Sequence, residues 1–107
     1  MTTFDKREEA FETQFVHDAE LKFKAEARRN RLLGLWAAEK LGKSGTEADT
    51  YAKDIVATEF EEGGDAAVLS KVVGDLAAKG VAVTEQDVLA KMTELLAVAV
   101  AQVKAGT

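Results

Sequence analysis

Glycine placement constrains the fold of this chain more than any other sequence feature. The 107 residues include no proline, and the glycines that separate four blocks of sequence are Gly42, Gly45, Gly63, Gly64 and Gly80. Apolar residues recur at helical spacing within each block, whereas no alternating run bounded by turn residues is long enough for a strand. A chain of this length forms one domain, so the sequence predicts an all-α fold, a compact helical bundle.

The last block carries the clearest helix signals. Thr84 precedes an apolar stripe and Asp87 follows three residues later, which is the spacing of a capping box. Val83 faces Val88 across this start as a hydrophobic staple. The pattern predicts a helix over residues 85–103 with Thr84 as its N-cap.

The two middle blocks have weaker start signals but distinct apolar faces. Thr46 and Asp65 are the predicted N-caps, and Gly80 is the predicted stop of the third block. The apolar faces comprise Ala48, Tyr51, Ala52, Ile55, Val56 and Phe60 in the second block and Val68, Leu69, Val72, Val73 and Leu76 in the third. These faces are expected to pack against neighbouring helices.

The first block does not fit one straight helix with one buried face. Phe4, Phe11 and Phe15 fall within ~40° of arc when residues are plotted at ~100° intervals, and beyond them the apolar stripe loses phase. A break in the helix explains both halves. We therefore predict an amphipathic N-terminal arm over residues 1–18, able to detach from a helical bundle over residues 19–107.

The helix that follows the arm is predicted to run from about residue 20 to residue 41. Its central segment, residues 32–38, is apolar nearly all round, which places Trp36 in the core. Phe23 is assigned to the same core. Gly34 weakens this helix by ~1 kcal/mol, and it also permits a neighbouring helix to pack closely.

The arm needs a surface to lie on. Its three phenylalanines contribute roughly 6 kcal/mol when buried, whereas ordering its residues costs ~1 kcal/mol or more apiece. Acidic residues outnumber basic ones along the arm, so an anionic membrane would repel it and direct membrane insertion is not expected. Either the arm closes the chain's own bundle or it inserts into a groove of another protein, with Phe4, Phe11 and Phe15 as anchors.

Composition argues against an enzyme and against a nucleic-acid binder. The chain has no cysteine and a single histidine, which excludes Cys/His nucleophilic pairs and multi-histidine metal sites. The net charge is −5, unfavourable for binding a polyanion. The imbalance is concentrated in residues 42–66, which hold two basic and seven acidic side chains.

One basic patch stands out from this acidic chain and comprises Lys22, Lys24, Arg28, Arg29 and Arg31. Arg28, Arg29 and Arg31 could bind RNA phosphates, or they could pair with the acidic segment at residues 59–65, and the negative net charge favours the second interpretation. Lys43 follows a glycine as in the tail of a phosphate-binding P-loop. The glycine and the strand that a P-loop requires before it are missing, so this match is rejected.

Short residue patterns in all four blocks resemble those of one protein family. The run EARRNRLLGLWAA at residues 26–38 resembles the central motif of the alphaproteobacterial ATPase inhibitor ζ-subunit family. Further matching patterns are Arg7-Glu8-x-x-Phe11-Glu12-x-x-Phe15, Asp18-x-Glu20-Leu21-x-Phe23, Tyr51-Ala52-Lys53, Phe60-Glu61-Glu62, Gly64-Asp65 and Lys91-Met92-x-Glu94-Leu95. The resemblance covers essentially the whole chain.

The resemblance implies a four-helix bundle that is a regulatory subunit of the F-type ATP synthase and inhibits its ATP hydrolysis. It implies that the N-terminal segment enters the catalytic head, formed by alpha, beta and gamma subunits, at an interface beside the rotor. The residues expected to bind this partner are Phe4, Arg7, Glu8, Phe11 and Phe15. A cytoplasmic location follows, with the protein held peripherally at the inner membrane through the synthase.

The resemblance also implies a regulatory site for ADP or ATP on the bundle, although no cofactor is required. No motif assigns its residues, and the electrostatic candidates are Arg28, Arg29, Arg31 and Lys43. The alternative function is a stand-alone helical module that responds to ADP or ATP. Catalysis is not expected under either function.

Overall fold

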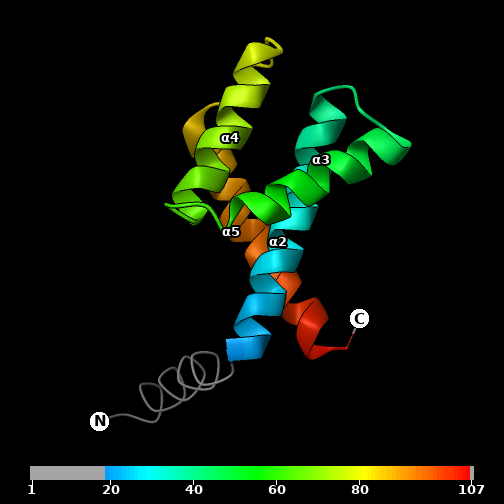
Figure 1. Ribbon diagram of the computed structural model, residues 1–107, viewed down its shortest axis with the longest axis vertical. Helices are drawn as coiled ribbons and strands as arrows, with labels where there is room; N and C mark the ends of the chain where they lie inside the picture. The colour runs from blue at the N-terminus through cyan, green and yellow to red at the C-terminus, as the bar shows by residue number, and fades with distance from the viewer. Residues whose placement is uncertain (1–18, 107) are drawn as a thin grey trace.

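The computed structural model describes residues 19–106, and they form an all-α bundle (Figure 1). These residues contain four helices and no strand, which confirms the predicted fold class. The helices are α2 (Ala19–Lys40), α3 (Gly45–Thr58), α4 (Asp65–Ala78) and α5 (Glu85–Lys104).

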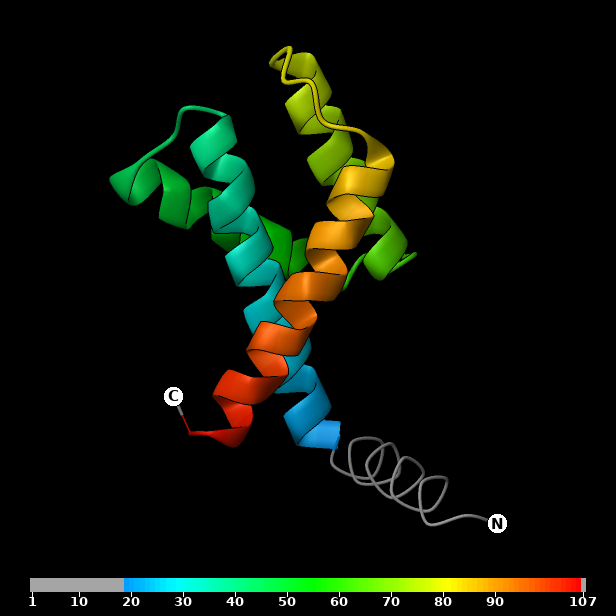
Figure 2. The same cartoon turned by 180° about the vertical axis from the view of Figure 1, so that it is seen from behind.

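Helix α2 is the element around which the others are arranged. It packs most extensively against α3 and α5, and the two views together place these helices on opposite sides of it (Figures 1 and 2). Helix α4 lies beside the first half of α5, which runs back along it, and α4 also contacts α2 and α3. Helix α2 accordingly has the most buried residues of the four helices, all between Ala25 and Ala38.

The core draws side chains from all four helices. Leu33, Ile55, Val72, Leu76 and Val88 have no exposed surface at all, and Tyr51 and Met92 are almost completely buried. Burying an aliphatic side chain of this size stabilises the fold by ~1.5–3 kcal/mol. Every buried residue of the described chain lies between residues 25 and 99.

Helices α2 and α3 approach each other closely at Gly34. A methyl group built on Gly34 would lie 2.6 Å from the Cα of Ala52 and 3.3 Å from a side-chain carbon of Ile55. Carbon atoms in van der Waals contact are ~3.5–4.0 Å apart. The prediction that Gly34 permits close packing by a neighbour is confirmed.

The start of α5 follows the predicted capping box. The backbone N–H of Asp87 donates to the Thr84 hydroxyl at 3.1 Å, and the Asp87 carboxylate accepts from the Thr84 backbone N–H at 3.0 Å. These hydrogen bonds lower the pKa of Asp87. The helix ends at Lys104, one residue beyond the predicted end.

Two predicted N-caps are wrong. Helix α3 begins after Ser44 rather than after Thr46, and its first residue, Gly45, has a φ of +56°, a left-handed conformation that favours glycine at this entry to the helix. Helix α4 has Gly64 at its N-cap, and Asp65 is its first helical residue. The Asp65 carboxylate is held by an arginine of α2 instead of capping its own helix.

The assignment of Phe23 and Phe60 to the core is also wrong. Phe23 is 54% exposed and Phe60 is 68% exposed. The first buried residue of α2 is Ala25, so Phe23 lies on an end of the helix that its neighbours do not enclose. Helix α3 ends at Thr58, and helical spacing no longer determines where Phe60 points. Trp36 is partly buried and packs against the core.

Candidate functional site

The predicted partner-binding residues lie outside the described part of the chain. Phe4, Arg7, Glu8, Phe11 and Phe15 all precede Ala19, where the described residues begin. Their role in binding therefore stays a prediction. The structure does place the basic candidates and the end of the bundle to which the arm is joined.

Arg29 anchors a polar network between α2 and the loop that joins α3 to α4. One of its terminal nitrogens lies 2.7 Å from Glu59 Oε1 and 2.7 Å from Asp65 Oδ1. Its Nε donates to Asn30 Oδ1 at 3.0 Å, and Asn30 Nδ2 donates to Glu59 Oε1 at 2.9 Å. The Arg29 side chain is only 4% exposed.

The pKa values of the two carboxylates in this network shift in opposite directions. The hydrogen bond from Arg29 lowers the pKa of Asp65 below its ordinary value. Burial raises the pKa of Glu59, although the hydrogen bond from Asn30 and the charge of Arg29 oppose the shift. A buried guanidinium requires partners of this kind, because an unpaired charge in the interior is costly.

For Arg29, the structure confirms the prediction that the basic patch pairs with the acidic segment, whereas no ion pair joins Arg28 or Arg31 to that segment in the described residues. Arg29 is committed to two carboxylates, and a phosphate would have to displace them to bind there. Sequence reasoning did not foresee the role of Asn30, which is completely buried. The available signal was helical spacing, since Asn30 lies three residues before Leu33 and seven before Ala37, on the buried face of α2.

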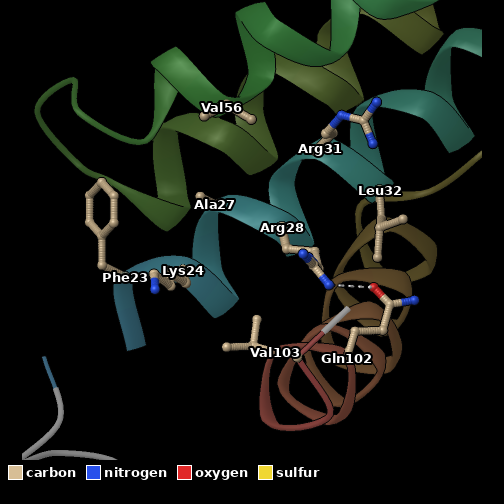
Figure 3. Close-up of a pocket in the computed structure, with 10 residues that line it drawn as sticks. Phe23, Lys24, Ala27, Arg28, Arg31, Leu32, Val56, Gln102 and Val103 are labelled. Carbon is tan, nitrogen blue, oxygen red and sulfur yellow. Dashed lines mark hydrogen bonds between the residues drawn. The ribbon is translucent and has the colours of Figure 1, made fainter. Parts of the chain in front are cut away.

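Arg28 and Arg31 line an open groove between α2 and the end of α5. Its volume is about 920 Å³, and Lys24 contributes a third basic side chain. Figure 3 shows Arg28 reaching across the groove to Gln102 of α5, with a long hydrogen bond of 3.5 Å. The apolar side chains that line the groove are Phe23, Leu32, Val56 and Val103.

Lys43 lies apart from this groove, in the loop between α2 and α3. It borders a hollow of about 410 Å³ that Tyr51, Lys71, Lys79 and others line. The Tyr51 hydroxyl donates to Asp75 at 2.8 Å, and burial together with this carboxylate raises the pKa of the phenol well above its usual range. The four predicted nucleotide contacts therefore do not meet in one place.

Two kinds of site are absent from the part of the chain that the structure describes. Within residues 19–106 no three side chains with metal-binding groups gather in one place. No helix in the same range is both long and apolar enough to cross a lipid bilayer.

Comparison with known proteins gives the family. The family model described as ATPase inhibitor subunit zeta matches residues 1–102. The chain belongs to this family. It is therefore a member of a family of ATPase inhibitor subunits, and the family match includes the arm as well as the bundle.

A solved structure supports the fold of this zeta-family chain. The chain is similar to a protein whose solution NMR structure has been determined, with 52% sequence identity and a TM-score of 0.71. The alignment covers 81% of this chain and 99% of the other. Among curated proteins, no match was found.

Proposed function

We propose that this chain inhibits ATP hydrolysis by the F-type ATP synthase by inserting residues 1–18 into the catalytic head. The observation that carries the proposal is the position of the core. All buried residues of the described bundle lie between residues 25 and 99, drawn from all four helices. A bundle with a core of its own does not need the apolar stripe of residues 1–18 to complete it, which supports a role for that stripe in binding a partner.

The proposed mechanism is steric. In a helix formed by residues 1–18, the spacing of Phe4, Phe11 and Phe15 would put them on one face, which suits insertion into an apolar groove of a partner. Arg7 and Glu8 lie between these anchors in the sequence and would pair with charged groups at the groove's edge. An arm wedged between alpha, beta and gamma subunits would prevent the domain closure that each catalytic cycle requires. The chain itself performs no catalysis in this proposal.

The proposed location follows from the partner. The catalytic head of a bacterial synthase faces the cytoplasm, and the chain would be held there, at the inner membrane, through its contact with the head. Direct insertion into the membrane forms no part of the proposal. No cofactor is needed for a steric mechanism.

A second candidate function rests on the groove beside Arg28. Three basic side chains border a hollow of about 920 Å³ with apolar walls, which suits the phosphates and base of ADP or ATP. Such a ligand would regulate the bundle, alone or in complex with the synthase. Arg29 would not contribute, since its carboxylate partners occupy it.

The experiment that tests the proposed function adds purified full-length protein to isolated catalytic heads and measures ATP hydrolysis. We expect inhibition that saturates with protein concentration. Replacement of Phe4, Phe11 and Phe15 together by alanine removes the anchors and should abolish inhibition without changing the melting of the bundle. Leu89→Ala is the matched control, because Leu89 is an exposed apolar residue on α5. Undiminished hydrolysis at saturating protein contradicts the proposal.

A further inference from the structure

Two exposed phenylalanines stand side by side at one end of the bundle. The ring centroids of Phe23 and Phe60 are 5.8 Å apart, with their planes tilted by 44°. Both rings are more than half exposed, although they come from different parts of the chain. Exposed aromatic side chains gathered in one place mark interaction surfaces, because their burial by a partner is strongly favourable.

A hollow lies at this pair. Its volume is about 250 Å³, and Phe23, Ala27, Val56 and Phe60 supply its apolar lining. We call these four residues the aromatic surface. Since the hollow lies at two large rings, an apolar side chain of a partner that entered it would be buried on several sides.

Charge is arranged asymmetrically around the aromatic surface. Glu26 lines the hollow, and Glu61 and Glu62 follow Phe60 in the loop, whereas Glu59, which also lines the hollow, is already paired with Arg29. The groove with the three basic side chains begins on the other side of Phe23, and Val56 lines both hollows (Figure 3). A partner that fits must place basic groups against the acidic side.

The aromatic surface is close to the point where the arm joins the bundle. Phe23 lies four residues after Ala19, which is about 6 Å along a helix. A protein that receives residues 1–18 is thereby brought next to this end of α2. The catalytic head, the proposed partner of residues 1–18, is therefore the partner expected to contact the aromatic surface.

We propose that the aromatic surface is a second docking site for the catalytic head, one that receives an apolar side chain flanked by basic residues. This inference rests on the proposed function. Charge argues against the other occupants, because a second copy of this chain carries a net charge of −5 and residues 1–18 hold five acidic and two basic side chains. Both carry more acidic than basic side chains, so the acidic side of the surface would on balance repel them.

The test compares inhibition curves for Phe23→Ala/Phe60→Ala and for the parent chain with isolated catalytic heads. The double variant should raise the half-inhibiting concentration at least ~10-fold while still reaching full inhibition at saturation, because it removes two anchors of binding and leaves the arm intact. Leu89→Ala serves as the control and should leave the curve unchanged. Unchanged inhibition by the double variant overturns the proposal.

A charge variant tests the same site with every aromatic ring in place. Glu61→Lys should raise the half-inhibiting concentration several-fold, and the increase should diminish at high salt. Glu39→Lys makes the same charge change on an exposed position near the far end of α2 and should have no effect. Equal effects of the two variants contradict a specific acidic contact.

Two further measurements identify a different occupant. Sedimentation that shows the parent as a dimer and Phe23→Ala/Phe60→Ala as a monomer assigns the surface to a second copy and overturns the proposal. Shifted NMR signals of the Phe60 ring after replacement of Phe4, Phe11 and Phe15 in the full chain assign it to the arm and also overturn it. If the parent chain itself fails to inhibit, the proposed function fails, and this outcome is distinct from a change in affinity.

Discussion

Gly34→Ala should destabilise the bundle even though alanine is the better helix former. The added Cβ would lie 2.6 Å from the Cα of Ala52, roughly 1 Å inside normal contact. Because that neighbour is backbone, it cannot rotate away, and α2 and α3 would have to separate. Separation would also loosen the packing of Ile55, whose side chain is 3.3 Å from the same point.

The expected magnitude is the difference between two opposing effects. Overpacking of a tight interface costs ~3 kcal/mol where the neighbour cannot yield. Replacing glycine by alanine inside a helix returns ~1 kcal/mol. The net loss should therefore be ~2 kcal/mol in the free energy of unfolding, which lowers the melting temperature of a domain this small by roughly 8–16 °C.

Gly74→Ala is the matched control. Gly74 lies inside α4, and a Cβ added there meets no atom within 4 Å. The same substitution should stabilise the bundle by ~0.5–1 kcal/mol, since only helix propensity changes. Urea unfolding followed by circular dichroism measures both variants. If Gly34→Ala proves as stable as the parent, the close α2–α3 crossing is wrong.

Three other predictions test local features. Thr84→Ala removes the N-cap of α5 and should cost ~1 kcal/mol in urea unfolding. Asp65→Asn should lower the free energy of unfolding by ~1 kcal/mol at pH 7, a small value since Asp65 is largely exposed. Because the pKa of Asp65 is lowered in the fold, its carboxylate stabilises the fold at pH values above 3.8, the ordinary pKa of this group. The unfolding free energies of variant and parent should therefore converge when urea titrations are carried to lower pH. ADP should shift backbone NMR signals around Arg28 and Arg31. Removing the charge of either arginine should weaken ADP binding ~10-fold or more. Shifts around Lys43 alone would place the ligand elsewhere.

The sequence predicted those features that depend on neighbouring residues along the chain. The capping box at Thr84 and the start of α5 were predicted correctly, because both are local hydrogen-bonding patterns. The close approach at Gly34 was also foreseen, since a glycine inside an apolar helix has few other uses. The resemblance of residues 26–38 to the zeta family agreed with the family match.

The features that sequence reasoning missed depend on contacts between distant residues. Aspartate is a residue type favoured at N-caps, but the Asp65 carboxylate instead accepts a hydrogen bond from Arg29, 36 positions away. Phe23 and Phe60 were assigned to the core because periodicity identifies an apolar face without showing whether another helix covers it. The nucleotide candidates were grouped by charge alone, and the bundle places Lys43 apart from Arg28.

The most direct test of the central claim is ATP hydrolysis by isolated catalytic heads in the presence of residues 19–107 alone. All of the buried core lies within this fragment, so it should remain helical and melt cooperatively in circular dichroism. Without the arm it should leave hydrolysis unchanged at concentrations where the full chain inhibits completely. Inhibition by the folded fragment would place the inhibitory surface on the bundle and contradict the account.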